Sequence, residues 1–189
     1  MGLIGANELK KKAMIALDGQ PFVVLDVVFA SPSARSSAAM VKVKVRNLLT
    51  GAVLDKNFKT GEKFDEPDVE MPPASFLYAD VNDYHFMDDA SYEQFSIPVE
   101  KLKDIKGYIR EGLALQAMKY NEAYVSLELP PYVELKVTTT EPGVRGDSSG
   151  SVLKPATLET GLQVRVPIYV KEGDVVRVNT QTGEVAGRA

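Results

Sequence analysis

The chain has 189 residues and carries 22 Lys and Arg against 26 Asp and Glu, a formal net charge of −4 at pH 7. Hydrophobic residues make up 44% and charged residues 25% of the sequence, proportions that exclude global disorder. The absence of Cys excludes disulfides, thiolate metal sites and a Cys nucleophile. No segment approaches the roughly 20 apolar residues of a membrane-spanning helix, so we expect a soluble, cytoplasmic protein.

The small net charge hides a gradient along the chain. Residues 1–66 carry 10 basic and 7 acidic side chains, a net charge of +3. Residues 67–130 carry 5 basic and 12 acidic side chains, a net charge of −7, and residues 131–189 carry 7 of each. This segregation would let the N-terminal segment approach phosphate groups, whereas the central segment would be repelled by them.

Short strands dominate the sequence from its N-terminal end. Residues 20–29 form an apolar run, and residues 39–46 alternate apolar and basic residues. Because successive side chains of a strand point to opposite faces, this alternation places Lys42, Lys44 and Arg46 on one face. We expect the apolar residues between them to face a core.

Further short strands follow, with one helical interruption. Strands are predicted at residues 52–58, 75–79, 84–87, 123–129, 132–139, 163–169 and 174–179. The stretch 91–113 has the best helical pattern, although Pro98 and Gly107 divide it into short pieces. The spacing predicts an all-β protein of three small β-barrels in series, including barrels of the OB type. They are expected at residues 1–66, 67–130 and 131–189.

No motif of catalysis or metal binding is recognisable. The single histidine, His85, lies between Tyr84 and Phe86 on a predicted strand without an evident Ser or carboxylate partner, so we expect a structural role. The nearby acidic residues lack the spacing of a calcium-binding loop. Because no nucleophile elbow, P-loop or dinucleotide fingerprint is present either, we expect no enzyme activity, no cofactor and no metal ion.

The C-terminal third carries the most specific motif. Residues 154–161 (KPATLETG) are followed by Val164, Val166-Pro167, Val170 and Gly173-Asp174. This spacing resembles the signature of the bacterial elongation factor P family. Further segments that resemble the family lie at residues 46–51, 58–59, 86–88 and 142–147. The resemblance covers essentially the whole chain and implies an SH3-like first domain of the KOW kind, two OB domains and a tRNA-like overall shape.

The resemblance also implies a function. Factors of this family bind the 70S ribosome beside the P-site peptidyl-tRNA, contact 23S rRNA and stimulate peptide-bond formation where consecutive prolines stall translation. We therefore expect a translation elongation factor that acts as a monomer, away from membranes, without a cofactor and without being an enzyme.

The segment 31–39 (SPSARSSAA) is the expected working tip of the first domain. Family members commonly present a Lys in a Pro-Gly-Lys-Gly turn, whereas this segment is longer, lacks Gly and has Arg35 as its only charge. The pattern is similar to the elongation factor P-like paralogue with an arginine at the tip. A guanidinium stays protonated, offers five donors and can stack on an unpaired base, so we expect unmodified Arg35 to position the tRNA end. The neighbours expected to shape the tip are Pro32, Ser33, Ala34 and Ser36.

The basic strand face is the second candidate site. Lys42, Lys44 and Arg46 could follow the backbone of tRNA or rRNA near the acceptor end, because phosphate contacts position a protein on nucleic acid. The alternative is a solvated outer face of the strand.

Two candidate contacts lie in the third domain. Gly146-Asp147-Ser148 stands where the family usually has Gly-Asp-Thr, a segment implicated in contact with the ribosome and mRNA near the E-site codon. A plain flexible turn is the alternative. Near the C-terminus, Val185 stands where relatives often place a Tyr, which leaves Arg188 as the expected contact there.

Other functions compete with this prediction. A general stimulator of peptide-bond formation would act beyond prolines. A KOW/OB nucleic-acid module outside translation elongation is a further alternative, but strands that bind bases usually expose aromatic rings among basic residues, and no such strand is present. The hypusine-bearing factor of archaea and eukaryotes shares the first barrel, but it has fewer domains and needs a tip lysine.

Overall fold

The computed structural model describes residues 2–30, 39–142 and 153–189. The chain divides into two compact units. Unit 1 comprises residues 1–70 and 118–126, and unit 2 comprises residues 71–117 and 127–189. None of the helices in the described part is long and apolar enough to cross a membrane.

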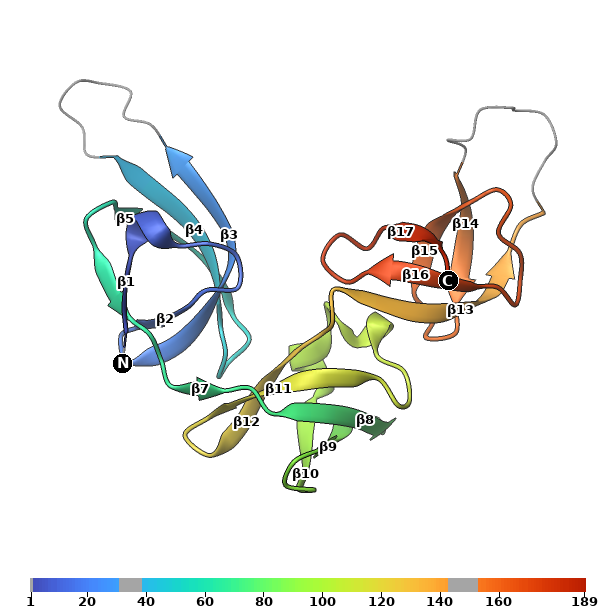
Figure 1. The fold of residues 1–189 in the computed structure, drawn as a ribbon, viewed down its shortest axis with the longest axis horizontal. Coiled ribbons are helices and arrows are strands. Elements are labelled where there is room, and N and C mark those ends of the chain that lie inside the picture. The colour runs from blue at the N-terminus through green and yellow to red at the C-terminus, as the bar shows by residue number, and fades with distance from the viewer. Residues whose placement is uncertain (1, 31–38, 143–152) are drawn as a thin grey trace. The chain divides into compact units, whose positions relative to one another are not determined.

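Unit 1 is built around a curled antiparallel sheet in the order β2-β3-β4-β5, in which β3 and β4 are the long strands (Figure 1). β1 pairs separately with β6, and β7 pairs with Lys119 and Tyr120 of β11 (Ala114–Tyr120), a strand whose last three residues belong to unit 1. The elements are β1 (Leu3–Gly5), a 3-10 helix η1 (Ala6–Glu8), β2 (Met14–Leu17), β3 (Gln20–Ala30), β4 (Met40–Asn47), β5 (Val53–Lys59), β6 (Lys63–Asp65) and β7 (Val69–Glu70). Its core contains Ile15, Val24, Val41, Val43, Val45 and Phe58.

The turn between β4 and β5 is fixed by a buried side chain. The Oδ1 atom of Asn47 accepts the backbone N–H groups of Leu49 at 2.8 Å and Thr50 at 3.0 Å. Gly51 has a φ of 76°, a left-handed conformation that favours glycine. The turn between these strands therefore lies at residues 47–51 and sets the pairing of β4 with β5.

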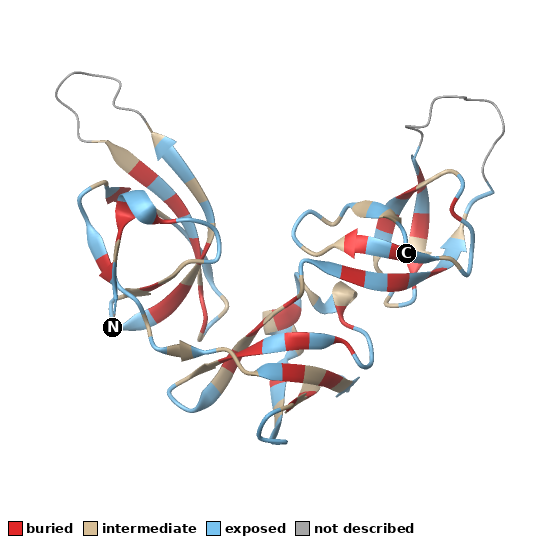
Figure 2. Cartoon of the chain, viewed as in Figure 1, coloured by how far each residue is buried: buried red, intermediate tan, exposed pale blue. Residues whose placement is uncertain are grey.

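Unit 2 contains two antiparallel sheets. One has the order β10-β9-β8-β11 and the other β15-β14-β13-β16-β17. Its elements are β8 (Pro73–Ala79), β9 (Asp83–Asp88), β10 (Gln94–Pro98), 3-10 helices η2 (Val99–Leu102) and η3 (Lys106–Tyr108), β11 (Ala114–Tyr120), β13 (Tyr132–Thr140), β14 (Leu153–Leu158), β15 (Gln163–Pro167), β16 (Val175–Asn179) and β17 (Val185–Arg188). β12 (Ala123–Glu128) leads from unit 1 into unit 2. Buried and exposed residues alternate along β13, as expected for a strand with one face on a core (Figure 2).

The helix predicted within residues 91–113 was wrong in part. Residues Gln94–Pro98 form β10, which pairs with residues 83–87 of β9, and two short 3-10 helices follow before β11. The strand forms because Ile97, 1% exposed, and Phe95, whose ring stacks on Phe86 at 5.5 Å, alternate with exposed residues. The all-β prediction is confirmed, since the described helices are all short 3-10 turns.

Candidate nucleic-acid interface

β4, an inner strand of the unit 1 sheet, has one face on the core and a basic face on the other side. Val41, Val43 and Val45 are buried, with exposed fractions of 0%, 2% and 0%. On the opposite face, Lys42 and Lys44 are exposed and Arg46, which follows Val45, is half-buried. Figure 2 shows this alternation along β4. The prediction that the three basic residues share one face is confirmed, and we call this surface the β4 basic face.

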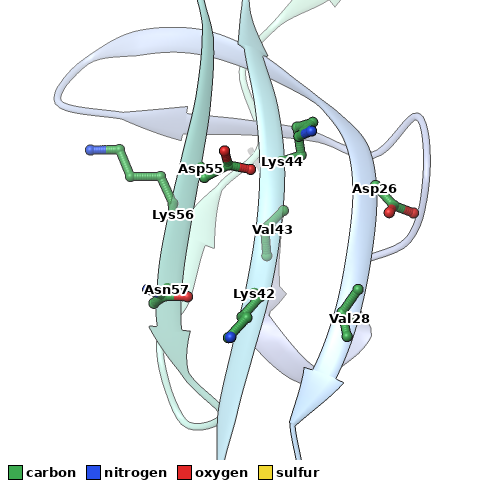
Figure 3. A pocket seen from close by; sticks show the side chains of 8 residues that line it. All are labelled: Asp26, Val28, Lys42, Val43, Lys44, Asp55, Lys56 and Asn57. Atoms are coloured by element: carbon green, nitrogen blue, oxygen red, sulfur yellow. The ribbon is translucent and has the colours of Figure 1, made fainter.

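The neighbouring strands give the two lysines different surroundings. Lys42 lies opposite Val28 of β3 and Asn57 of β5, both uncharged. Lys44 lies opposite Asp26 of β3 and Asp55 of β5. Figure 3 shows the two cross-strand rows. Because opposite charges on facing positions of a sheet attract each other, the charge of Lys44 is partly compensated while that of Lys42 is not.

Asp26 is itself held by a second lysine. The Nζ atom of Lys11 lies 3.1 Å from Oδ1 of Asp26. The hydrogen bond from Lys11 and then its charge lower the pKa of Asp26 below its usual value, with a smaller contribution from the charge of Lys44. Asp26 is thus ionised at neutral pH. The pair is exposed and contributes little to the free energy of unfolding. Because Lys11 pairs with Asp26, the charge of Lys11 is partly offset.

The β4 basic face is shallowly hollowed. The hollow encloses about 420 Å³ and is lined by Asp26, Val28, Lys42, Val43, Lys44, Asp55, Lys56 and Asn57. The lining offers ammonium groups and amide or carboxylate oxygens but no aromatic ring. Such a surface suits contact with phosphates and ribose hydroxyls, not stacking with bases. Sequence reasoning missed the residues of β5 here, because the sequence VLDKNFK of this strand shows no regular alternation of apolar and polar residues.

Other predicted site residues fall elsewhere. Arg35 and its neighbours Pro32, Ser33, Ala34 and Ser36 lie outside the described residues, in the segment that connects β3 with β4. Gly146, Asp147 and Ser148 also lie outside the described residues, between β13 and β14. Arg188 belongs to β17, where its side chain is 61% exposed and its Nη1 atom lies 3.8 Å from Oδ2 of Asp174. Of the predicted site, the described structure therefore brings together only Lys42, Lys44 and Arg46.

Comparison with known proteins decides the family. Three models match successive segments: the elongation factor P KOW-like domain at residues 5–64, the elongation factor P OB domain at 69–127, and "Elongation factor P, C-terminal" at 133–188. Elongation factor P of Oleidesulfovibrio alaskensis is 40% identical over 186 residues, 98% of this chain and 100% of its own length. That of Bdellovibrio bacteriovorus is 41% identical over 182 residues, 96% of both chains. The chain belongs to the elongation factor P family.

Membership in the elongation factor P family confirms two predictions. The resemblance to the family is confirmed, with residues 154–174 inside the segment matched by the C-terminal model, and the KOW-like and OB folds match the curled sheets of the two units. The branch with an arginine at the tip stays a prediction, as do the domain boundaries after residues 66 and 130.

Proposed function

We propose that this elongation factor P-family protein binds the 70S ribosome beside the P-site peptidyl-tRNA, contacts 23S rRNA and accelerates peptide-bond formation at consecutive prolines. Family membership makes the chain a translation elongation factor, and the observation that carries the proposal is the match over 98% of this chain and 100% of its relative's length. The exposed β4 basic face supports it, because β4 and β3 bear the proposed tip segment.

The proposed mechanism is positioning, not acid–base chemistry. The proline ring fixes φ and limits how the donor and acceptor can align, so ordering of the tRNA end accelerates the reaction. In this proposal Lys42 anchors unit 1 on the RNA backbone, and Arg35 of the arginine-tip type orders the tRNA end at the tip. The third-domain contacts at Gly146-Asp147-Ser148 and Arg188 hold the third domain on the ribosome. The factor works in the cytoplasm as a monomer, without a cofactor.

Translation of a triple-proline reporter in a purified system tests the function. Addition of the wild-type protein is expected to relieve the stall, while a matched reporter with Ala codons in place of the Pro codons is translated at an unchanged rate. Failure to relieve the stall would contradict the proposal. Equal stimulation of both reporters would instead identify a general stimulator of peptide-bond formation.

Charge reversal on the β4 basic face tests the proposed contact. Lys42→Glu is expected to weaken ribosome binding about tenfold at low salt, because each lost phosphate contact removes a salt-sensitive attraction. Lys44→Glu is expected to weaken binding less, about threefold, because Asp26 and Asp55 already offset the charge of Lys44. Co-sedimentation with ribosomes over a salt series measures both effects.

The matched control is Lys63→Glu, which makes the same charge change at an exposed position of β6, outside the sheet that carries the basic face. This variant is expected to bind like the wild type. Unchanged binding of Lys42→Glu at every salt concentration would remove the β4 basic face from the site.

A further inference from the structure

A β-bulge in unit 2 brings a tyrosine to the surface. Phe76 of β8 lies opposite Phe86 of β9, and both are core residues with exposed fractions of 8% and 0%. In a regular strand Tyr78, two residues later, would point to the same side as Phe76. The register shifts between Phe76 and Tyr78, so Leu77 is an extra residue and Tyr78 lies opposite His85. Tyr78 is consequently 55% exposed on the outer face.

The exposed tyrosine belongs to a cluster joined by ring stacking and hydrogen bonds. The rings of Tyr78 and His85 stack with centroids 4.4 Å apart and planes 19° apart. The Nε2 atom of His85 lies 2.8 Å from Oδ2 of Asp80, which corrects the expectation that His85 has no carboxylate partner. Oδ1 of Asp80 accepts the backbone N–H groups of Asn82 and Asp83, both at 2.8 Å. One carboxylate thus fixes both the turn and the imidazole ring.

The cluster carries negative charge at neutral pH. The hydrogen bond from His85, followed by those from the backbone of Asp83 and Asn82, lowers the pKa of Asp80 to about 2. Asp83 lies two residues before His85 on β9, on the same face of the strand. Val81 at the tip of the turn is 92% exposed. The surface therefore combines a fixed aromatic ring, an exposed apolar side chain and carboxylates.

These features suit a cationic side chain, and arginine in particular. A guanidinium stacks on the face of a Tyr ring and donates to carboxylates at the same time. Tyrosine and arginine also dominate the strongly contributing positions of protein interfaces. An RNA partner is disfavoured, because residues 67–130 carry a net charge of −7 that repels phosphates.

We propose that the tip of the β8–β9 hairpin docks a basic segment of a partner protein, with an arginine stacked on Tyr78 and facing the carboxylates of Asp80 and Asp83. This contact is separate from the β4 basic face, which carries the opposite charge. The docking proposal rests on the proposed function in one respect, because the partner protein is expected to be part of the ribosome.

Photo-crosslinking from the tip identifies the partner. A photoreactive amino acid replaces Val81, and the protein is bound to ribosomes and irradiated. The expected product is a crosslink to a protein, within a peptide that contains arginine. Tyr78→Ala is expected to reduce the yield at least fivefold, and Tyr78→Phe, which keeps the ring, to retain it. Tyr92→Ala, which removes a 74% exposed tyrosine from the next turn of the same sheet, is expected to have no effect. A crosslink to RNA, or equal yields for Tyr78→Ala and Tyr92→Ala, would overturn the proposal.

Co-sedimentation of the wild type with ribosomes in the same samples distinguishes failure of the proposed function from failure of the docking proposal. If the wild type does not bind ribosomes, docking is tested on the free protein with a hexa-arginine peptide, followed through the NMR signals of the side-chain rings. The signals of Tyr78 and His85 are expected to shift, and those of Tyr92 to stay, with a shift that shrinks as salt is added. Unmoved signals of Tyr78 and His85 would refute the docking surface without reference to the ribosome.

Discussion

Arg35→Ala is expected to lose at least about tenfold of the acceleration on a triple-proline reporter while it still binds ribosomes, a change of about 1.4 kcal/mol in the barrier. Arg35 is the only charge of the segment 31–39, so its loss removes the group proposed to order the tRNA end. The β4 basic face, the proposed RNA contact, is not altered in this variant, so ribosome binding is expected to persist. The loss should therefore appear in the rate of peptide-bond formation and not in the affinity.

Two further variants separate the roles of charge and shape. Arg35→Lys keeps the positive charge but not the planar fork of donors, and an intermediate rate is expected. Ser36→Ala changes a neighbour without altering the charge and is expected to act like the wild type. The measurement is the dipeptide-to-tripeptide rate on proline codons, together with ribosome binding. Full activity of Arg35→Ala would remove Arg35 from the mechanism and leave the family's function standing.

The basic face could be predicted from the sequence because it depends on local geometry alone. The positions of Lys42, Lys44 and Arg46 follow from the two-residue period of a single strand. The surroundings of these residues could not be predicted in the same way. Asp26 reaches Lys44 only through the register of β3 on β4, and that register shifts between Val24 and Asp26. A one-residue change in pairing moves every side chain to the other face.

Two features of the sheet that contains β8, β9 and β10 could not be predicted from the sequence, again because they depend on strand pairing. Residues 94–98 were included in a predicted helical stretch, because five residues are too few to distinguish the two periods, and the strand forms only through pairing with β9. At Tyr78, the alternation that begins at Phe76 predicts a buried ring. The extra residue Leu77 reverses it, and no turn signal or glycine in the strand marks the bulge. Both differences arise from pairing between strands, which the local sequence pattern of a single strand does not reveal.

Phe86→Ala is expected to have the largest effect on stability, a loss of about 3–5 kcal/mol in the free energy of unfolding. Phe86 is 0% exposed, and its ring lies 5.5 Å from those of both Phe76 and Phe95. Truncation therefore leaves a cavity lined by the rings of Phe76 on β8 and Phe95 on β10. Since domains are stable by only about 5–15 kcal/mol, much of this sheet's stability would be lost. Urea unfolding followed by circular dichroism measures the change.

Tyr78→Ala is the matched comparison, because simple alternation along β8 would bury Tyr78 beside Phe76, whereas the bulge turns it outward. Its loss removes the stack on His85 and exposes no cavity, so a cost below about 1.5 kcal/mol is expected. If Tyr78→Ala destabilised the protein as much as Phe86→Ala, the ring would be a core residue and could not serve as a docking platform. A small loss in the free energy of unfolding for Tyr78→Ala, beside a large one for Phe86→Ala, would mean that the bulge maintains an exposed aromatic ring that folding does not require. That result is expected of a residue whose role is to bind a partner.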